Sequence, residues 1–340
     1  MLRIAIIGLG WAGIRHVEAI RELGRKITED CLVDNDADHL KVQAEELGIP
    51  KTYTDFHDAL ADPDVDAVSI CTPHNLHCPI ALEAAAAKKH ILCEKPMATT
   101  VADATRMIDA AEKSDVKLYV AENLPYTPMS KFLREVVRTG KHIGEMTFAS
   151  VVNGFRAPQF GYPGRRAWLT TPEHGGTGTW MLHGIHSMAQ LRFILGEVET
   201  IYMGEHKVNS FQRRDLEGTM SGLLTLESGV HVSVTQTCET RLPHNLRGYI
   251  IHGDAGSIIA SQDRCDVFSG ADDAGIFNYP EDELSDYAQE MEAFADYVAR
   301  LSVGPTTARS ERKSLAIVQG GYESARSGQP VNLKTRFGEL

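Results

Sequence analysis

The chain has 340 residues, which suits two domains better than one because single domains usually contain about 100–200 residues. Hydrophobic residues make up 43% and charged residues 24% of the sequence, as in ordinary soluble globular proteins. The 46 acidic and 34 basic residues give a net charge of -12, which repels a phosphate backbone. Since no run of lysines and arginines counters this charge, we expect two globular domains that do not bind nucleic acid.

The cysteines and the apolar runs predict the cell compartment. Six cysteines are present, none forms a CxxC pair, and three lie in or beside apolar runs, so we expect reduced, buried thiols. The first apolar run, residues 2–7, is too short for a signal peptide. No later stretch approaches the roughly 18 apolar residues of a membrane span. The chain is therefore expected to be cytoplasmic, with no membrane partner.

A glycine-rich turn follows the first predicted strand. Residues 3–7 form an apolar run, GLGWAG follows at 8–13, and residues 14–23 have helical spacing before a terminating glycine. In such a turn Gly8 allows the bend, Gly10 lets the backbone approach a pyrophosphate, and Gly13 lets the helix pack on the strand. A plain glycine turn is the alternative, because GxGxxG alone is unspecific. The predicted phosphate-binding residues are Gly8, Gly10, Trp11, Ala12 and Gly13.

Asp34 predicts which dinucleotide is bound. It ends a second apolar run and lies 26 positions after Gly8, near the spacing of about 20 expected for the acid that binds the ribose hydroxyls. A carboxylate there accepts a bond from the 2′-hydroxyl but repels a 2′-phosphate, and no arginine follows it closely. NAD is therefore favoured over NADP. The alternative role for Asp34 is to cap a helix from about Asp36 to Leu47, which Asp36 could do instead.

Strands and helices then alternate up to residue 121. Strands are predicted at 52–54, 66–71, 90–93 and 117–121, with helical patterns at about 79–87 and 101–114. Such units predict a doubly wound parallel sheet, a Rossmann domain over residues 1–123, whose ligand lies at the carboxyl ends of the strands. The residues that follow those ends are Thr72, Pro73, His74, Asn75, Glu94, Lys95, Glu122 and Asn123.

The rest of the chain, residues 124–340, has a different pattern. Segments 146–154, 218–226, 229–237 and 249–253 have strand character with turn residues between them, which predicts an α+β domain with a large, mainly antiparallel open sheet. Helices cover one face of such a sheet, so we expect the other face to make a homodimer or homotetramer. The helices expected at about 283–301 and 310–325 are predicted to return toward the first domain.

A loop between residues 156 and 180 is rich in arginine and aromatic side chains. It contains Arg156, Tyr162, Arg165, Arg166, Trp168 and Trp180. Aromatic rings stack on the apolar faces of sugar rings, and arginines pair with carboxylates, so the loop suits an acidic or ring-shaped polyol substrate. For each single arginine a surface salt bridge is the alternative.

The motifs together resemble the Gfo/Idh/MocA family of oxidoreductases. The resemblance rests on the glycine turn, on Cys71-Thr72-Pro73 with His77 after it, on Glu94-Lys95-Pro96 and Asn123, and on Trp168 followed by Gly175-Gly176-Thr177-Gly178. It extends to a helix with His186 and to Tyr322-Glu323-Ser324-Ala325-Arg326-Ser327-Gly328 near the end. It implies NAD bound by the residues at the strand ends and by His77, with a substrate site that includes Tyr126, Arg156, Arg166, Trp168, Trp180 and His183.

The resemblance also implies two catalytic groups. Lys95 is expected near the nicotinamide and the reacting hydroxyl, and His186 is expected to be the general acid/base. A lysine there can orient or polarise the substrate oxygen. The alternatives are a solvated surface lysine and a hydrogen-bonded core histidine.

One position departs from the family pattern. The family has an aspartate one helical turn before His186, whereas this chain has Leu182 there, with His183 beside it. Either His183 takes over as the partner of His186, or Glu122 or Glu173 reaches in, or the chemistry differs. His183 and His186 could also share a metal with His174 or His244, but this ligand set is incomplete and we expect no metal. The arginine usual after Asn123 is also missing, and Leu124-Pro125-Tyr126 stands there.

These patterns predict an NAD(H)-dependent oxidoreductase of a secondary hydroxyl or its carbonyl on a sugar, cyclitol or related small molecule. One alternative enzyme keeps NAD bound and oxidises a sugar only transiently, so that elimination or epimerisation follows. Another alternative is a sensor that binds the nucleotide without turnover, although Lys95 and His186 are both present.

Overall fold

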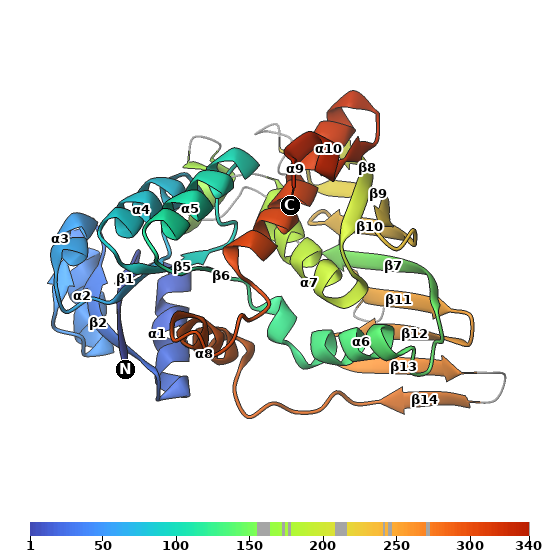
Figure 1. Ribbon diagram of the computed structural model, residues 1–340, viewed down its shortest axis with the longest axis horizontal. Helices are drawn as coiled ribbons and strands as arrows, with labels where there is room; N and C mark the ends of the chain where they lie inside the picture. The colour runs from blue at the N-terminus through green and yellow to red at the C-terminus, as the bar shows by residue number, and fades with distance from the viewer. Residues whose placement is uncertain are drawn as a thin grey trace. The chain divides into compact units, whose positions relative to one another are not determined.

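The computed structural model describes residues 1–154, 164–171, 174–175, 178–207, 216–240, 242–243, 247–269 and 273–339 (Figure 1). The chain divides into two compact units. Unit 1 contains Met1–Asn123, Glu173–Gly175 and Glu283–Arg312, and unit 2 contains Leu124–Pro172, Gly176–Asp282 and Lys313–Leu340. Residues 283–312 thus group with the N-terminal part, although most of unit 2 precedes them in the sequence.

Unit 1 is built on a six-stranded parallel sheet in the order β3-β2-β1-β4-β5-β6. Its strands are β1 (Leu2–Ile7), β2 (Ile27–Val33), β3 (Thr52–Tyr53), β4 (Ala67–Ile70), β5 (His90–Glu94) and β6 (Leu118–Ala121). All five neighbouring pairs are parallel. The strand order reverses between β1 and β4, which is where such sheets bind dinucleotides. The predicted Rossmann sheet is confirmed.

The helices of unit 1 lie on both faces of this sheet. They are α1 (Trp11–Leu23), α2 (Ala37–Leu47), α3 (Phe56–Ala61), α4 (His74–Ala86), α5 (Val101–Lys113) and α8 (Asp286–Val298). Figure 1 shows α4 and α5 on one face and α1 with α8 on the other. Met291 and Phe294 of α8 are fully buried in one core cluster with Val17 and Ile20 of α1. α8 is thereby an integral part of unit 1.

Two helix starts differ from the sequence expectation. The helix expected from Pro79 begins five residues earlier, at His74, and Pro79 lies inside it. The expectation was wrong because Pro73 already serves as the N-cap, and a proline within a helix does not always mark its first turn. The first helix begins at Trp11, so part of the glycine motif is helical. α3 was not predicted.

Unit 2 contains a nine-stranded sheet in the order β14-β13-β12-β11-β7-β10-β9-β8-β15. Every neighbouring pair is antiparallel except β10 with β7, so the mainly antiparallel sheet is confirmed. The strands are β7 (Met146–Gly154), β8 (Val198–His206), β9 (Thr219–Leu226), β10 (His231–Thr237), β11 (Gly248–Gly253), β12 (Gly256–Ser261), β13 (Arg264–Ser269), β14 (Asp273–Phe277) and β15 (Val331–Asn332). The sequence analysis had not predicted β8, β12, β13, β14 and β15.

The two faces of this sheet differ in what covers them. Its helices are α6 (Pro128–Thr139), α7 (Ile185–Leu195), α9 (Ala308–Ser327), which begins in unit 1, and α10 (Leu333–Phe337). Gln190 of α7 links the covered face, since it accepts a bond from the Tyr249 hydroxyl at 3.2 Å and donates to the Ser130 hydroxyl at 2.8 Å. The register places several exposed apolar side chains together on the other face: Phe148, Tyr202, Leu223, Ile250, Ile259, Phe268 and Ile276.

All six cysteines are buried and free, which confirms the prediction of reduced thiols. Among the described residues, no helix combines the length and the apolar character needed to cross a membrane.

Candidate active site

The glycine turn of unit 1 has the geometry that a pyrophosphate needs. Gly8 has a φ of 95°, and a Cβ atom on it would lie 2.7 Å from the Cys71 carbonyl oxygen. A Cβ atom on Gly13 would lie 2.1 Å from the Gly8 carbonyl oxygen. Gly10 differs, because its Cβ position has no atom within 4 Å, and as the N-cap of α1 it offers no side chain to the first helical amides. An anion can therefore approach these amides and the positive end of the helix dipole.

Asp34 lies directly after β2 and is only 5% exposed. One carboxylate oxygen accepts a bond from the Leu9 amide at 2.9 Å, and the other accepts from the Asp36 amide at 3.0 Å. Asp34 thus ties the glycine turn to the end of β2. The cap of α2 is Asp36, whose side chain accepts from the His39 amide, so the alternative role for Asp34 as the cap is wrong.

Two histidines shape the ends of β4 and β5. The ring nitrogens of His77 lie 2.9 Å from the carbonyl oxygens of Thr72 and Pro96, so this buried ring connects the two strand ends. The Lys95-Pro96 peptide bond is cis. His74 Nδ1 lies 3.0 Å from the Gly175 carbonyl oxygen. Burial lowers the pKa of both histidines, so His77 is neutral and supports the turns that carry Thr72 and Lys95.

Glu94 connects the predicted catalytic lysine to a histidine that the sequence analysis missed. One Glu94 oxygen accepts from the Lys95 amide at 3.0 Å, and the other lies 3.2 Å from His16 Nε2. His16 is fully buried, and its Nδ1 lies 2.7 Å from the Ser69 hydroxyl. Burial opposes the charged form of His16, but Cys71 and Glu94 outweigh it and raise its pKa well above the ordinary value. No local pattern marks His16, because its partners Ser69 and Glu94 lie on two later strands, β4 and β5.

α8 adds two further carboxyl groups to unit 1. Asp286 accepts a bond from the Asn123 amide group at 2.6 Å. Glu290 is 1% exposed, and neither of its carboxyl oxygens has a hydrogen-bond partner within the described residues. Burial raises the pKa of Glu290 well above its usual range, with Glu94 and Glu122 adding to the shift and His16 opposing it. Glu290 is therefore held in its protonated form.

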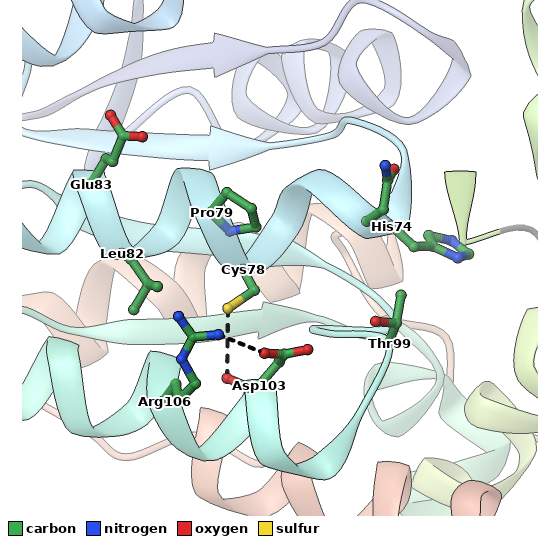
Figure 2. A pocket seen from close by; sticks show the side chains of 9 residues that line it. His74, Cys78, Pro79, Leu82, Glu83, Thr99, Asp103 and Arg106 are labelled. Carbon is green, nitrogen blue, oxygen red and sulfur yellow. Dashed lines mark hydrogen bonds and ion pairs between the residues drawn. The ribbon is translucent and has the colours of Figure 1, made fainter. Parts of the chain in front are cut away.

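A hollow of about 360 Å³ lies between α4 and α5 (Figure 2). In Figure 2 the Arg106 guanidinium pairs with Asp103 at 2.9 Å, and the Cys78 thiol points at the Asp103 carbonyl oxygen. The lining residues are His74, Asn75, Cys78, Pro79, Leu82, Glu83, Thr99, Asp103 and Arg106. All of them except Thr99 belong to α4 and α5.

The histidine helix of unit 2 begins with a π-helical turn. This turn, Trp180–Gly184, contains His183, and α7 follows directly with His186 in its first turn. The two imidazole rings lie 6.3 Å apart and are tilted by 40°. Both histidines are partly exposed, whereas Leu182, Gly184 and their other neighbours in the helix are buried. The structure therefore brings the two predicted proton-transfer residues together at an accessible surface.

The residues predicted to bind substrate have different environments. Trp180 is fully buried, and its indole donates to the Val318 carbonyl oxygen at 3.0 Å, so the expectation that it stacks on a substrate is corrected. Tyr126 is also buried. Arg165 and Arg166 are exposed, and Trp168 is partly exposed, in the 3-10 segment Gly164–Thr170. Outside the described residues lie Arg156, Tyr162, Glu173, Gly176, Thr177 and His244.

Within the described residues, no group of three or more histidine, cysteine, aspartate or glutamate side chains is arranged to hold a metal ion. His174 is described, but it belongs to unit 1, whereas His183 and His186 belong to unit 2.

The comparisons with known proteins cover both units. Residues 2–122 match the oxidoreductase family with an NAD-binding Rossmann fold, and residues 131–259 match the GFO/IDH/MocA C-terminal domain. The chain belongs to the Gfo/Idh/MocA family. It is an oxidoreductase with an NAD-binding domain, as the sequence predicted.

Three relatives show how far the similarity extends. A myo-inositol 2-dehydrogenase of Thermotoga maritima is 38% identical over 139 residues, which are 41% of each chain. A 1,5-anhydro-D-fructose reductase of Ensifer adhaerens is 27% identical over 94% of each chain. An oxidoreductase of Agrobacterium radiobacter, solved with NAD+, L-tartaric acid and magnesium, has a TM-score of 0.85 and 25% identity, with 98% of this chain and 99% of that one covered.

Proposed function

We propose that the chain is an NAD(H)-dependent dehydrogenase or reductase acting on a secondary hydroxyl, or its carbonyl, of a sugar, cyclitol or related small molecule, acidic ones included. One arrangement in unit 1 carries the proposal. The glycine turn, Asp34 and Lys95 all follow carboxyl ends of the same parallel sheet, where such folds bind a dinucleotide. The named relatives act on a cyclitol and on an anhydro sugar, which supports this substrate class.

The residues of unit 1 fit NAD. Gly10 leaves room for a pyrophosphate beside the start of α1, and Asp34 ends the strand next to the turn, where a carboxylate can accept bonds from ribose hydroxyls. When bound, NAD supplies the hydride acceptor at C4 of the nicotinamide. The carboxylate of Asp34 disfavours a second phosphate at the ribose, so we propose NAD as the preferred cofactor over NADP.

Two side chains of the chain are proposed to handle the substrate hydroxyl. During oxidation His186 takes the hydroxyl proton, and during reduction it returns it. Lys95 stabilises the negative charge that develops on the substrate oxygen. Leu182 cannot orient His186, so His183, whose ring lies 6.3 Å away, is its proposed neighbour in the proton transfer.

The test of this function is a substrate panel. Purified protein with NAD is mixed with cyclitols, aldoses, uronates and dihydrodiols, and NADH absorbance is followed. We expect NADH formation with at least one class, and faster turnover with NAD than with NADP. Absence of turnover across the panel in both directions, while NAD still binds, contradicts the proposal.

The alternative enzyme, which keeps NAD bound and oxidises its sugar only transiently, is not favoured. The named relatives are a dehydrogenase and a reductase, which carry out net oxidation or reduction.

We further propose that the open face of the unit 2 sheet binds a second copy of the chain. Seven exposed apolar side chains from as many strands share this face, and apolar side chains gathered on one exposed face mark an interaction surface. An Ile250→Asp variant should lower the mass measured by light scattering to that of a monomer, while Val42→Asp, at an exposed position of unit 1, should not. A wild-type protein that is monomeric at micromolar concentration contradicts the proposal.

A further inference from the structure

A buried carboxyl group lies at the start of the histidine helix. Glu217, two residues before β9, is 4% exposed. Its Oε1 accepts a hydrogen bond from the Trp180 amide at 2.8 Å, and its backbone carbonyl accepts from the Thr179 amide at 3.1 Å. The first amides of a helix have no partner within the helix, so an acceptor from elsewhere fixes where the helix begins.

Tyr322 of α9 completes this arrangement. Its hydroxyl donates to Glu217 Oε1 at 2.9 Å and accepts from the Met181 amide at 3.1 Å. The amides of two successive residues, Trp180 and Met181, therefore end on one hydrogen-bonded Glu217–Tyr322 pair. The indole bond from Trp180 to the Val318 carbonyl joins the same turn to the preceding part of α9.

The glycines around this pair show how closely the segments approach. A Cβ atom on Gly178 would lie 1.9 Å from Glu217 Oε2, so the carboxyl group occupies the space of a side chain at that position. A Cβ atom on Gly184 would lie 2.6 Å from the Trp180 ring. Any larger residue at either position would displace the carboxyl group or the indole. The start of the helix is thus held from the outside by close packing as well as by hydrogen bonds.

We propose that Glu217 is a positioning residue for His183 and His186. The inference rests on the proposed function, in which these histidines transfer the proton. His183 lies in the π-helical turn that begins at Trp180, and π turns are rare and occur frequently at functional sites. The register of that turn sets the directions of both imidazoles, and Glu217 with Tyr322 sets where the turn starts. The chain has Leu182 where the family has an aspartate beside the catalytic histidine. In this chain the Glu217 carboxylate instead positions the histidines through its bond to the helix backbone.

The ionisation of Glu217 gives the arrangement a pH dependence. Burial raises the pKa of Glu217 to about 7, against the lowering effect of its bonds to Trp180 and Tyr322. Among the described residues, the titratable groups that act on it besides Tyr322 are Glu205 of β8 and Cys238 after β10. Ionised Glu217 accepts charge-assisted hydrogen bonds from the Trp180 amide and the Tyr322 hydroxyl, and such bonds are stronger than neutral ones. The hydrogen bonds from Glu217 therefore fix the π-helical turn most strongly above about pH 7. A histidine that acts as general base must be neutral in the same pH range.

The experiment compares Glu217→Gln and Tyr322→Phe with Glu227→Gln, an exposed glutamate just after β9. The first readout needs no substrate: the imidazole carbon-proton NMR signals of His183 and His186, assigned with single His→Gln variants, are titrated with pH. We expect both test variants to move the titration of at least one histidine and Glu227→Gln to leave both unchanged. Tyr322→Phe removes only a hydroxyl, so it remains informative if Glu217→Gln does not fold.

The second readout is kinetic, with the best substrate of the panel. We expect kcat to fall about 10-fold in both test variants with the KM for NAD unchanged, because misplaced catalytic groups slow the reaction without weakening cofactor binding. The rise of kcat through about pH 7 should become smaller in Glu217→Gln, because the contribution of Glu217 is removed and only that of His186 itself remains. Unchanged histidine titrations and unchanged kcat in both variants overturn the inference, even if the enzyme is active. Altered titrations without turnover of any panel compound reject the proposed function and leave the positioning role standing.

Discussion

The two units form their candidate sites in different ways. In unit 1 the backbone makes the site: parallel strands end together, Gly8 and Gly13 allow a close turn, and α1 begins with open amides. In unit 2 side chains make it, because the Glu217 carboxyl group, the Tyr322 hydroxyl and the Trp180 indole join distant parts of the chain at the start of the histidine helix. A site made by backbone geometry leaves a local sequence motif, whereas one made by side-chain contacts does not.

The largest change in stability is expected at Gly13, where the backbone of α1 lies against the backbone of the glycine turn. Gly13→Ala places a Cβ atom 2.1 Å from the Gly8 carbonyl oxygen, so α1 must move, at a cost of about 3 kcal/mol. Gly10→Ala is the control, since no atom lies within 4 Å of its Cβ position. Calorimetry should show a melting temperature lowered by roughly 6–12 °C in Gly13→Ala alone. Gly10→Ala should fold but bind NAD more weakly, because its methyl group meets the pyrophosphate. Equal stability of the two variants would remove the backbone argument for unit 1.

The second largest effect is expected for Lys95, which directly follows β5 in unit 1. Lys95→Ala should keep the fold and NAD affinity and lower kcat by about 10² or more, the scale for losing a group that stabilises charge in the transition state. Lys88→Ala, on the loop before β5, is the control and should retain full activity. NAD binding by fluorescence titration and steady-state kinetics separate the two effects. Turnover near that of the wild type in Lys95→Ala takes Lys95 out of the mechanism.

The fold of unit 1 could be predicted because its signals are local. The glycine motif, Asp34 and the alternation of strands and helices predict the doubly wound parallel sheet that the structure contains, and they predict a dinucleotide site at its strand ends. The start of α4 was missed because Pro79 suggested a first turn, whereas Pro73 caps the helix. β12, β13 and β14 were missed because short half-exposed strands have weak patterns.

The side-chain contacts could not be predicted, and the reason is sequence separation. Trp180 was expected to face a substrate, but its buried indole donates a hydrogen bond to the backbone carbonyl of Val318 in α9. His16 bonds to Ser69 and Glu94, each more than 50 residues away, and no motif announces it. The contact of Glu217 with the helix start is reflected in the sequence by the glycine at position 178, because the Glu217 carboxyl group occupies the space of a side chain there. The sequence alone does not tell which carboxyl group fills that space.

A smaller effect is expected at Glu290 of unit 1, whose carboxyl group is buried without a hydrogen-bond partner among the described residues. Glu290→Met replaces a buried carboxyl group that has no hydrogen-bond partner in the described residues with an apolar chain of similar length, and should raise stability at pH 8 by about 2 kcal/mol. The folded-state pKa of Glu290 is raised, so its contribution is complete below the unfolded pKa of about 4.3 and is lost as pH rises through the folded pKa. The gap between variant and wild type should therefore widen with rising pH.

Calorimetry measures this difference in stability between Glu290→Met and the wild type. It is carried out from about pH 5 to about pH 8, where the protein is expected to stay folded. Glu292→Met serves as the control, because Glu292 pairs with Arg25 and Lys26 and these bonds lower its pKa. It should lose stability where Glu290→Met gains it. A gap that narrows with rising pH would show that Glu290 is ionised in the fold.

The smallest effect is expected for cofactor choice, where one charge decides between two similar ligands. Asp34→Asn keeps an oxygen that can accept the Leu9 amide but removes the negative charge, so repulsion of a 2′-phosphate falls. We expect the ratio of kcat/KM for NAD to that for NADP to fall about 10-fold, or about 1.4 kcal/mol. Asp36→Asn is the matched control, since asparagine caps helices as well as aspartate does and α2 should keep its start. If both variants change the ratio equally, the discrimination comes from the general charge of the region and Asp34 does not set it.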